Sequence, residues 1–218
     1  MDKQLTKEQI EELEKQLSCP SGEMGTEVGK NMNESNIGMT LNTIEFLELQ
    51  NGHQVLELGH GNCGHLDEVL NAGKYMKYFG LEISETMMHE AKNNNQNQEA
   101  EFNLYDGINI PFPDNSFNRT FSVNTIYFWA NREKLMQEIE RTLKPGGICI
   151  LTYANKDFMK NLPFVGEKFR LYDPKDLEEL VSITDLQMIQ TLQKEEQVKS
   201  KAGEPVLRTY SMTKLRKP

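Results

Sequence analysis

The sequence predicts an α/β protein with a seven-stranded, mostly parallel sheet, an antiparallel C-terminal strand and helices on both faces. Two observations indicate this class. Short apolar runs with β-branched or aromatic residues alternate with stretches in which apolar residues recur at helical spacing. The last two apolar runs have no helical stretch between them, so we expect them to pair as an antiparallel hairpin at the sheet edge.

Turn and capping residues separate the expected elements. In the N-terminal part, apolar spacing predicts a helix at 3–17 and a second helix at 41–49. The stretch 19–38 between them is rich in glycine and shows no period, so we expect a loop. The expected strands then lie at 54–58, 75–83, 101–105, 119–123, 148–153, 187–192 and 206–213. Further helices are expected at 66–72, after the N-cap residues Ser84 and Asn131, and at 174–181.

The composition is typical of a globular protein, and we expect it in the cytoplasm. The chain has 218 residues, of which 37% are hydrophobic, enough for a sizeable core. No apolar run could span a bilayer, and the first residues lack the apolar stretch of a secretory signal. The 3 cysteines are scattered, which indicates reduced thiols. A net charge of -9 disfavours binding to a nucleic-acid backbone.

A glycine-rich loop after the first expected strand is the strongest sign of a ligand site. Gly59 and Gly61 let the backbone turn tightly there and come close to a ligand. Glu82 ends the next strand about twenty residues further on, where a carboxylate can accept hydrogen bonds from both hydroxyls of a ribose. The loop and this acid together indicate an adenosine-containing ligand.

Two kinds of adenosine ligand fit this loop. Gly59, Gly61 and Gly64 have the G-x-G-x-x-G spacing of a dinucleotide site, which leaves an NAD(P)-dependent oxidoreductase as an alternative. Glu57 lies just before the loop, and its carboxylate would repel a pyrophosphate but attract an ammonium group. S-adenosylmethionine carries an amino group and a sulfonium and has no phosphate, so the charge favours this methyl donor.

Further motifs agree with a methyl donor. An apolar strand, an acid and G-x-G lie at 55–61, a strand-end acid at 81–84, and a Leu-Lys-Pro-Gly-Gly turn at 143–147. Two more motifs lie between the last two of these. One is formed by 105–107 together with 111–117, and the other is the fourth expected strand with its following loop at 119–129. With these motifs the chain resembles the class I S-adenosylmethionine-dependent methyltransferases, particularly the small-molecule, ubiquinone/menaquinone methyltransferase-like (type 11) group. The resemblance implies a Rossmann-like methyltransferase domain at 41–218 and suggests, by analogy, an N-terminal helix and a lid-like segment at 1–40.

The resemblance also implies S-adenosylmethionine as cofactor and S-adenosylhomocysteine as product. In the family, an acid at the position of Asp106 contacts the adenine amino group, and the next residue, here Gly107, lies near the ring. Cys63 departs from the usual glycine at its position, where we expect a small residue to be tolerated. The residues predicted to bind the cofactor are Glu57, Gly59, His60, Gly61, Cys63, Glu82, Ile83, Asp106, Gly107 and Asn124.

The acceptor is expected to be a small molecule. The stretch after the fourth strand lacks the Asn/Asp-Pro-Pro-aromatic tetrad of enzymes that methylate nucleic-acid bases. Aromatic residues follow the fourth and fifth strands and suggest a pocket for an apolar or planar acceptor, although such rings also pack protein cores. The pocket candidates are Tyr127, Trp129, Tyr153, Phe164 and Phe169.

The sequence assigns no catalytic residue. Methyl transfer from a sulfonium is an in-line displacement, in which the protein mainly aligns the reacting atoms. A general base is needed only if the acceptor must lose its proton early. The absence of a clear acid–base group leaves a non-catalytic module that binds the donor as a second alternative. His60, Cys63 and His65 have spacings unlike those of a tetrahedral zinc site, so no metal is expected.

Overall fold

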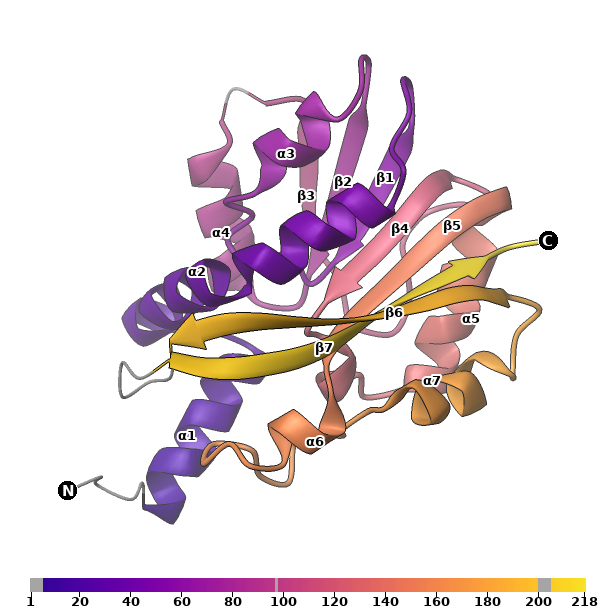
Figure 1. Cartoon of the computed structure of the whole chain (residues 1–218). Helices are drawn as coiled ribbons and strands as arrows, with labels where there is room; N and C mark the ends of the chain where they lie inside the picture. Colours follow the sequence, from indigo (N-terminus) through magenta and orange to yellow (C-terminus); the bar gives the residue numbers. More distant parts are fainter. Residues whose placement is uncertain (1–5, 97, 200–204) are drawn as a thin grey trace.

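A computed structural model describes residues 6–96, 98–199 and 205–218 (Figure 1). Its centre is one seven-stranded sheet with the order β3-β2-β1-β4-β5-β7-β6. The first five strands pair in parallel, whereas β7 runs antiparallel to both β5 and β6, so the predicted fold class is confirmed. The strands are β1 (Gln54–Leu58), β2 (Lys77–Glu82), β3 (Ala100–Leu104), β4 (Phe117–Val123), β5 (Leu143–Ala154), β6 (Gln187–Lys199) and β7 (Pro205–Arg216).

Helices cover both faces of the sheet (Figure 1). On one face, α2 (Gly22–Phe46), α3 (Leu66–Asn71) and α4 (Glu85–Asn94) pack over one apolar cluster. On the other face, α5 (Arg132–Thr142) and α7 (Pro174–Val181) pack over a second cluster. The remaining helical elements are α1 (Lys7–Ser18), the 3-10 turn η1 (Ile126–Phe128) and α6 (Lys156–Met159). None of the helices in the described ranges is both long and apolar enough to cross a membrane.

The strands divide their side chains between the two clusters because successive residues of a strand point to opposite faces. In β1, Val55 belongs to the cluster under α2, whereas Leu56 and Leu58 belong to the cluster under α5. Glu57 therefore lies on the face of Val55, although it is a carboxylate with only 2% of its surface exposed. A buried charge at the end of a central strand needs partners, and they lie in the ligand site described below.

Local capping determines where several helices begin. The Ser84 hydroxyl accepts a hydrogen bond from the backbone N–H of Met87 at 3.1 Å, and Asn131 caps Lys134 at 3.0 Å. Both N-caps are the ones predicted from the sequence. Thr6 forms a capping box with Gln9 and begins α1, so the predicted first helix is confirmed from residue 7 onward, and its residues 3–5 lie outside the described ranges.

The expected loop at 19–38 is wrong, because α2 runs without a break from Gly22 to Phe46. The glycines that suggested a loop instead allow close packing. A Cβ on Gly25 would lie 2.6 Å from the carbonyl carbon of Pro20, and a Cβ on Gly29 would lie 2.3 Å from Sδ of Met87. Tertiary contact thus explains residues that local propensity assigns to turns. The helix also crosses residue 40, where the predicted lid-like segment was to end.

The C-terminal hairpin is longer than expected. Strands β6 and β7 pair from Gln187 with Arg216 to Lys199 with Pro205, whereas β5 reaches only to the pair Ala154 with Tyr210. The far part of the hairpin therefore extends past the sheet and lies beside α2 (Figure 1). Its polar sequence gave no sign of this extension, which brings β7 residues to the ligand cavity.

Candidate donor and acceptor site

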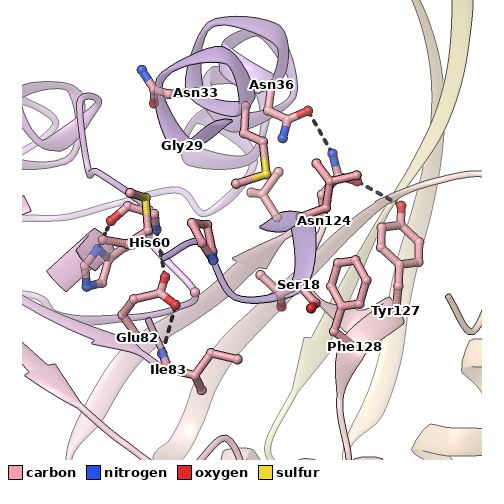
Figure 2. Close-up of a pocket in the computed structure, with 18 of the residues that line it drawn as sticks. Ser18, Gly29, Asn33, Asn36, His60, Glu82, Ile83, Asn124, Tyr127 and Phe128 are labelled. Atoms are coloured by element: carbon pink, nitrogen blue, oxygen red, sulfur yellow. Dashed lines mark hydrogen bonds between the residues drawn. The ribbon is translucent and has the colours of Figure 1, made fainter. Parts of the chain in front are cut away.

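A cavity of about 360 Å³ lies at the carboxyl ends of the parallel strands. In an open α/β sheet, this is where ligands bind. The loops after β1, β2, β3 and β4 form one side, and α2, the end of α1 and the segment after α6 form the other. Figure 2 shows α2 across the cavity from the strand ends, with Asn33 and Asn36 opposite Glu82 and Tyr127.

The glycine loop after β1 requires its first two glycines. Gly59 has φ 74 and Gly61 has φ 58, a backbone conformation that other residues rarely adopt. A Cβ on Gly59 would also lie 2.4 Å from Cγ2 of Thr125, so a side chain would collide with the loop after β4. The third glycine has a different role, because a Cβ on Gly64 would lie 2.9 Å from Nδ2 of Asn33 on α2.

Glu82 connects the glycine loop to the end of β2. One carboxylate oxygen accepts a hydrogen bond from the N–H of Gly61 at 3.0 Å, and the other accepts from Ile83 at 2.8 Å and Ser84 at 3.0 Å. Burial raises the pKa of this carboxyl group, and the backbone hydrogen bonds oppose that rise. The side chain lines the cavity, so the carboxylate faces both the loop and any ligand bound there.

Glu57 belongs to a buried network beside the cavity. Its Oε2 accepts hydrogen bonds from the Tyr78 hydroxyl and from Nε2 of His65, the latter at 2.8 Å. Burial lowers the pKa of His65, but the charge and the hydrogen bond of Glu57 outweigh it and leave that pKa raised. Glu57 and His65 line the cavity wall. Within the part of the chain that the structure describes, both hydrogen bonds of Glu57 side-chain oxygens use Oε2, so Oε1 can accept from a cationic group in the cavity.

Cys63 lies behind this network and not on the cavity wall. It is fully buried, and its thiol donates to the Tyr78 hydroxyl at 3.2 Å. Ligand atoms of Glu57, Cys63 and His65 lie within 4.8 Å of one another, and the Tyr78 hydroxyl bonds to two of them. Hydrogen bonds thus account for this cluster. Cys63 was predicted to bind the cofactor, but it does not line the cavity.

His60 contributes its backbone to the cavity, whereas its ring packs into the core. The ring lies edge-on to Phe102 with centroids 5.0 Å apart, and its Cδ2 would lie 2.6 Å from a Cβ on Gly80. Burial lowers the pKa of His60 to about 4, so the ring is neutral. Nδ1 lies 2.7 Å from the carbonyl oxygen of Gly61, to which a neutral ring donates. The ring is therefore an anchor for the glycine loop.

The β3 side of the cavity carries Asp106 and Gly107, which are predicted to lie at the adenine, and Ile83, which is predicted to bind the cofactor. Ile83, Asp106 and Gly107 all line the cavity. The Asp106 carboxylate accepts from the N–H groups of Ile108 at 2.8 Å and Asn109 at 2.7 Å, and these hydrogen bonds, Asn109 first, lower its pKa. This turn fixes the direction of the loop after β3.

Asn124 follows β4 with φ 58 and is held on both ends of its side-chain amide. Its Oδ1 accepts from the N–H of Ala154 at 3.1 Å and from the Tyr127 hydroxyl at 2.9 Å, and its Nδ2 donates to Oδ1 of Asn36 at 3.0 Å (Figure 2). Nearby, Nε1 of Trp129 donates to Thr125 at 3.0 Å. The loop after β4 is thereby fixed against both β5 and α2.

Aromatic and apolar side chains line the end of the cavity beyond this loop. Phe128 and Phe169 are in edge contact with centroids 4.6 Å apart. The residues that line this end are Leu17, Met32, Phe128, Trp129, Phe158, Met159, Leu162, Phe164 and Phe169. Cationic Arg208 also lines the cavity, and it is paired with Glu196 at 2.6 Å.

Known proteins agree with this geometry. The family model described as "Methyltransferase domain" matches residues 56–151. Methyltransferase GfsG of Streptomyces halstedii is 28% identical over 113 residues, which are 50% of this chain and 40% of that protein. The uncharacterized methyltransferase YdaC of Bacillus subtilis is 29% identical over 120 residues, 54% of this chain and 66% of that protein. Residues 56–151 thus match a methyltransferase domain, and about half of the chain is similar to named methyltransferases.

A solved methyltransferase structure shares the fold. A chain in the complex between the Haloferax volcanii Trm112 methyltransferase activator and its methyltransferase partner superposes with a TM-score of 0.75 at 16% identity, covering 88% of this chain and 94% of that one. This likeness concerns the fold alone. The matched segment covers less than two thirds of the curated relatives GfsG and YdaC.

The structure brings together most of the site that the sequence predicted for a class I methyltransferase. Cys63 and Tyr153 are the two exceptions among the predicted residues, since neither lines the cavity. Tyr153 has no exposed surface and packs against Tyr172 with ring centroids 6.2 Å apart, because its position on β5 points into the core under α5. The predicted residues on the cavity wall are Glu57, Gly59, His60, Gly61, Glu82, Ile83, Asp106, Gly107, Asn124, Tyr127, Trp129, Phe164 and Phe169.

The sequence missed the wall formed by the N-terminal helices and β7. This wall includes Ser18, Asn33, Asn36 and Arg208, which belong to no motif. A buried carboxylate of α1 also holds the segment after α6. Glu14 accepts from the N–H of Gly166 at 2.9 Å and of Lys168 at 3.2 Å. A Cβ on Gly166 would lie 2.7 Å from that carboxylate, so the absence of a side chain there allows the close approach of Glu14.

Proposed function

We propose that this protein transfers the methyl group of S-adenosylmethionine to a small-molecule acceptor with an apolar or planar part. The single observation that carries the proposal is the position of Glu57 and Glu82, two buried carboxylates on one cavity wall beside the glycine loop. The cationic methionine end of S-adenosylmethionine is complementary to Glu57 and its ribose to Glu82, as the sequence suggested. The match of residues 56–151 to a methyltransferase domain supports the same donor.

Within this proposal, the residues of the chain bind and orient the donor. Oε1 of Glu57 meets its ammonium group, the carboxylate of Glu82 accepts from its ribose hydroxyls, and the turn at Asp106 and Gly107 lies along its adenine. When bound, the donor supplies an already activated methyl group on a sulfonium. The apolar end of the cavity holds the acceptor in line and excludes water. His60 is too deeply packed to act as a base.

A dinucleotide cofactor is the weaker alternative on physical grounds. A pyrophosphate at the glycine loop would face the carboxylate of Glu57. Among the described residues that line the cavity it would find no unpaired cation, since Arg208 is paired with Glu196. The third glycine of the dinucleotide spacing, Gly64, faces Asn33 of α2 and so has a packing role. These features argue against an NAD(P)-dependent oxidoreductase.

Transfer of label tests the proposed activity. The protein is incubated with S-adenosylmethionine carrying a labelled methyl group and with a small-molecule metabolite extract. We expect label in at least one compound, and we expect that label to disappear with Glu82→Ala. If S-adenosylhomocysteine binds tightly and no compound becomes labelled, the protein is a non-catalytic donor-binding module.

A further inference from the structure

The side-chain amide of Asn36 lies where the donor end of the cavity meets the apolar end. It comes from α2, lines the cavity and contacts Asn124, the residue that begins the loop after β4. Figure 2 shows it opposite Phe128, which belongs to the apolar end. No family motif includes this residue, and the sequence gave it no role.

The hydrogen bonds around Asn36 determine the positions of its amide oxygen and nitrogen. Nη1 of Arg208 lies 2.9 Å from one end. A guanidinium can only donate hydrogen bonds, so this end is the oxygen. Nδ2 of Asn124 donates to the same oxygen at 3.0 Å. The amide nitrogen of Asn36 therefore occupies the other end. If nitrogen and oxygen exchanged places, the N–H groups of Asn36 would point at the N–H groups of Arg208 and Asn124.

Arg208 is itself held firmly, so the amide has a rigid support. Arg208 is only 6% exposed, and its guanidinium donates to Glu196 at 2.6 Å and to the carbonyl of Ser35 at 2.7 Å. The charge of Arg208 is neutralised by Glu196, so this part of the wall carries no net charge. The extended β6–β7 hairpin supplies both residues, which gives it a function at the site.

The nitrogen of Asn36 has no hydrogen-bond partner among residues 6–96, 98–199 and 205–218. Its two N–H groups therefore remain for a molecule in the cavity. An N–H group with a fixed direction in an apolar pocket favours a ligand whose oxygen accepts its hydrogen bond. It disfavours an ammonium group or a plain hydrocarbon at that point.

We propose that Asn36 is a specificity-determining residue that selects acceptors with a hydroxyl or carbonyl oxygen near the methyl-transfer position. It does so by donating a hydrogen bond from its amide nitrogen to that oxygen. This inference rests on the proposed function, because it takes the apolar end of the cavity as the acceptor site. It narrows the acceptor class to oxygen-bearing molecules that have an apolar or planar body and no ammonium group at that point.

Isosteric probes test the inference without knowledge of the natural acceptor. The protein is saturated with S-adenosylhomocysteine, and the affinities of 2-acetylnaphthalene and 2-isopropenylnaphthalene are measured by titration. These molecules have the same shape, but only the first offers a carbonyl oxygen. We expect the ketone to bind about tenfold more tightly than the hydrocarbon.

Two substitutions locate the preference. The Asn36→Asp side chain still accepts hydrogen bonds from Arg208 and Asn124, but an oxygen replaces its amide nitrogen. Asn36→Leu removes both the hydrogen-bond acceptor and the N–H groups. We expect both variants to bind the two probes with affinities within about twofold of each other or to favour the hydrocarbon. Asn31→Asp is the matched control, since Asn31 is exposed on the same helix and does not line the cavity. It should keep the tenfold preference.

The outcomes separate the two proposals. Absence of S-adenosylhomocysteine binding contradicts the proposed function itself. If S-adenosylhomocysteine binds but the ketone is no tighter than the hydrocarbon, including the case in which neither binds, the inference about Asn36 is overturned. A ketone preference that survives in folded Asn36→Leu overturns it as well.

Discussion

The carboxylate of Glu82 joins two parts of the donor site, because it accepts backbone hydrogen bonds from Gly61 as well as from Ile83 and Ser84. These hydrogen bonds already orient both carboxylate oxygens of Glu82, and the hydroxyls of a bound ribose would donate further hydrogen bonds to them. The position of this acid was predictable from its place at the end of β2. Its contact with the glycine loop was not, since a strand-end acid can equally face solvent.

Removing this carboxylate should weaken donor binding. We expect Glu82→Ala to lower the affinity for S-adenosylhomocysteine by about 1–3 kcal/mol, because the ribose hydroxyls lose their acceptor and the N–H of Gly61 loses its partner. Isothermal titration measures this change. Glu101→Ala, at an exposed position of β3, is the control and should bind as the unchanged protein does. Equal affinity in a folded Glu82→Ala variant would mean that another carboxylate holds the ribose.

The two histidines of the glycine loop respond to pH in opposite directions. The pKa of His65 is raised, so its pair with Glu57 stabilises the fold fully below the unfolded value of 6.5 and loses this effect as the pH rises through the folded pKa. The pKa of His60 is lowered, so its neutral ring stabilises the fold above 6.5 and loses this effect as the pH falls.

His60 should make the protein sensitive to acid. Between its ordinary pKa of 6.5 and its folded pKa of about 4, it should account for a loss of about 3 kcal/mol in the free energy of unfolding. Urea denaturation at pH 7 and pH 4 measures the loss. In His60→Gln, which cannot take up a proton, the fall over this range should be smaller by that amount. An identical fall in both proteins would contradict the account of a buried neutral ring.

At the scale of elements, the alternation of strands and helices from β1 to β5 followed from the sequence, because apolar periodicity and capping residues such as Ser84 and Asn131 act locally. Helix α2 could not be predicted in this way. Its glycines are needed where other segments come close, and such contacts are known only once the chain is folded. The length of the hairpin was missed for a similar reason, since its outer residues pack on α2 and not on the sheet.

The glycines of α2 provide a test of this explanation. In an open helix, a glycine-to-alanine change would stabilise by about 1 kcal/mol. At Gly25 the added Cβ would lie 2.6 Å from backbone of Pro20, so we expect Gly25→Ala to lower the free energy of unfolding by about 1–3 kcal/mol. Asn31→Ala, on the exposed side of the same helix, should raise it by about 0.5 kcal/mol in the same urea titration. A more stable Gly25→Ala protein would refute the packing role.

At the scale of the whole molecule, the cavity is built from segments far apart in the chain. The donor side comes from the ends of β1, β2 and β3, and these residues were predictable because parallel strands place their carboxyl ends at one edge. The opposite side comes from α1, α2, the segment after α6 and β7. The contact of Asn36 with Asn124 and Arg208 joins three such segments, and no spacing in the sequence announces it.

The central claim is that the glycine loop and its two acids hold S-adenosylmethionine and not a dinucleotide. Calorimetric titration of the protein with S-adenosylhomocysteine and, separately, with NAD tests this claim most directly. We predict binding of S-adenosylhomocysteine at one site per chain and no response to NAD, since the Glu57 carboxylate attracts the ammonium group of the first and repels the pyrophosphate of the second. Tight binding of NAD with no heat from S-adenosylhomocysteine would contradict the account.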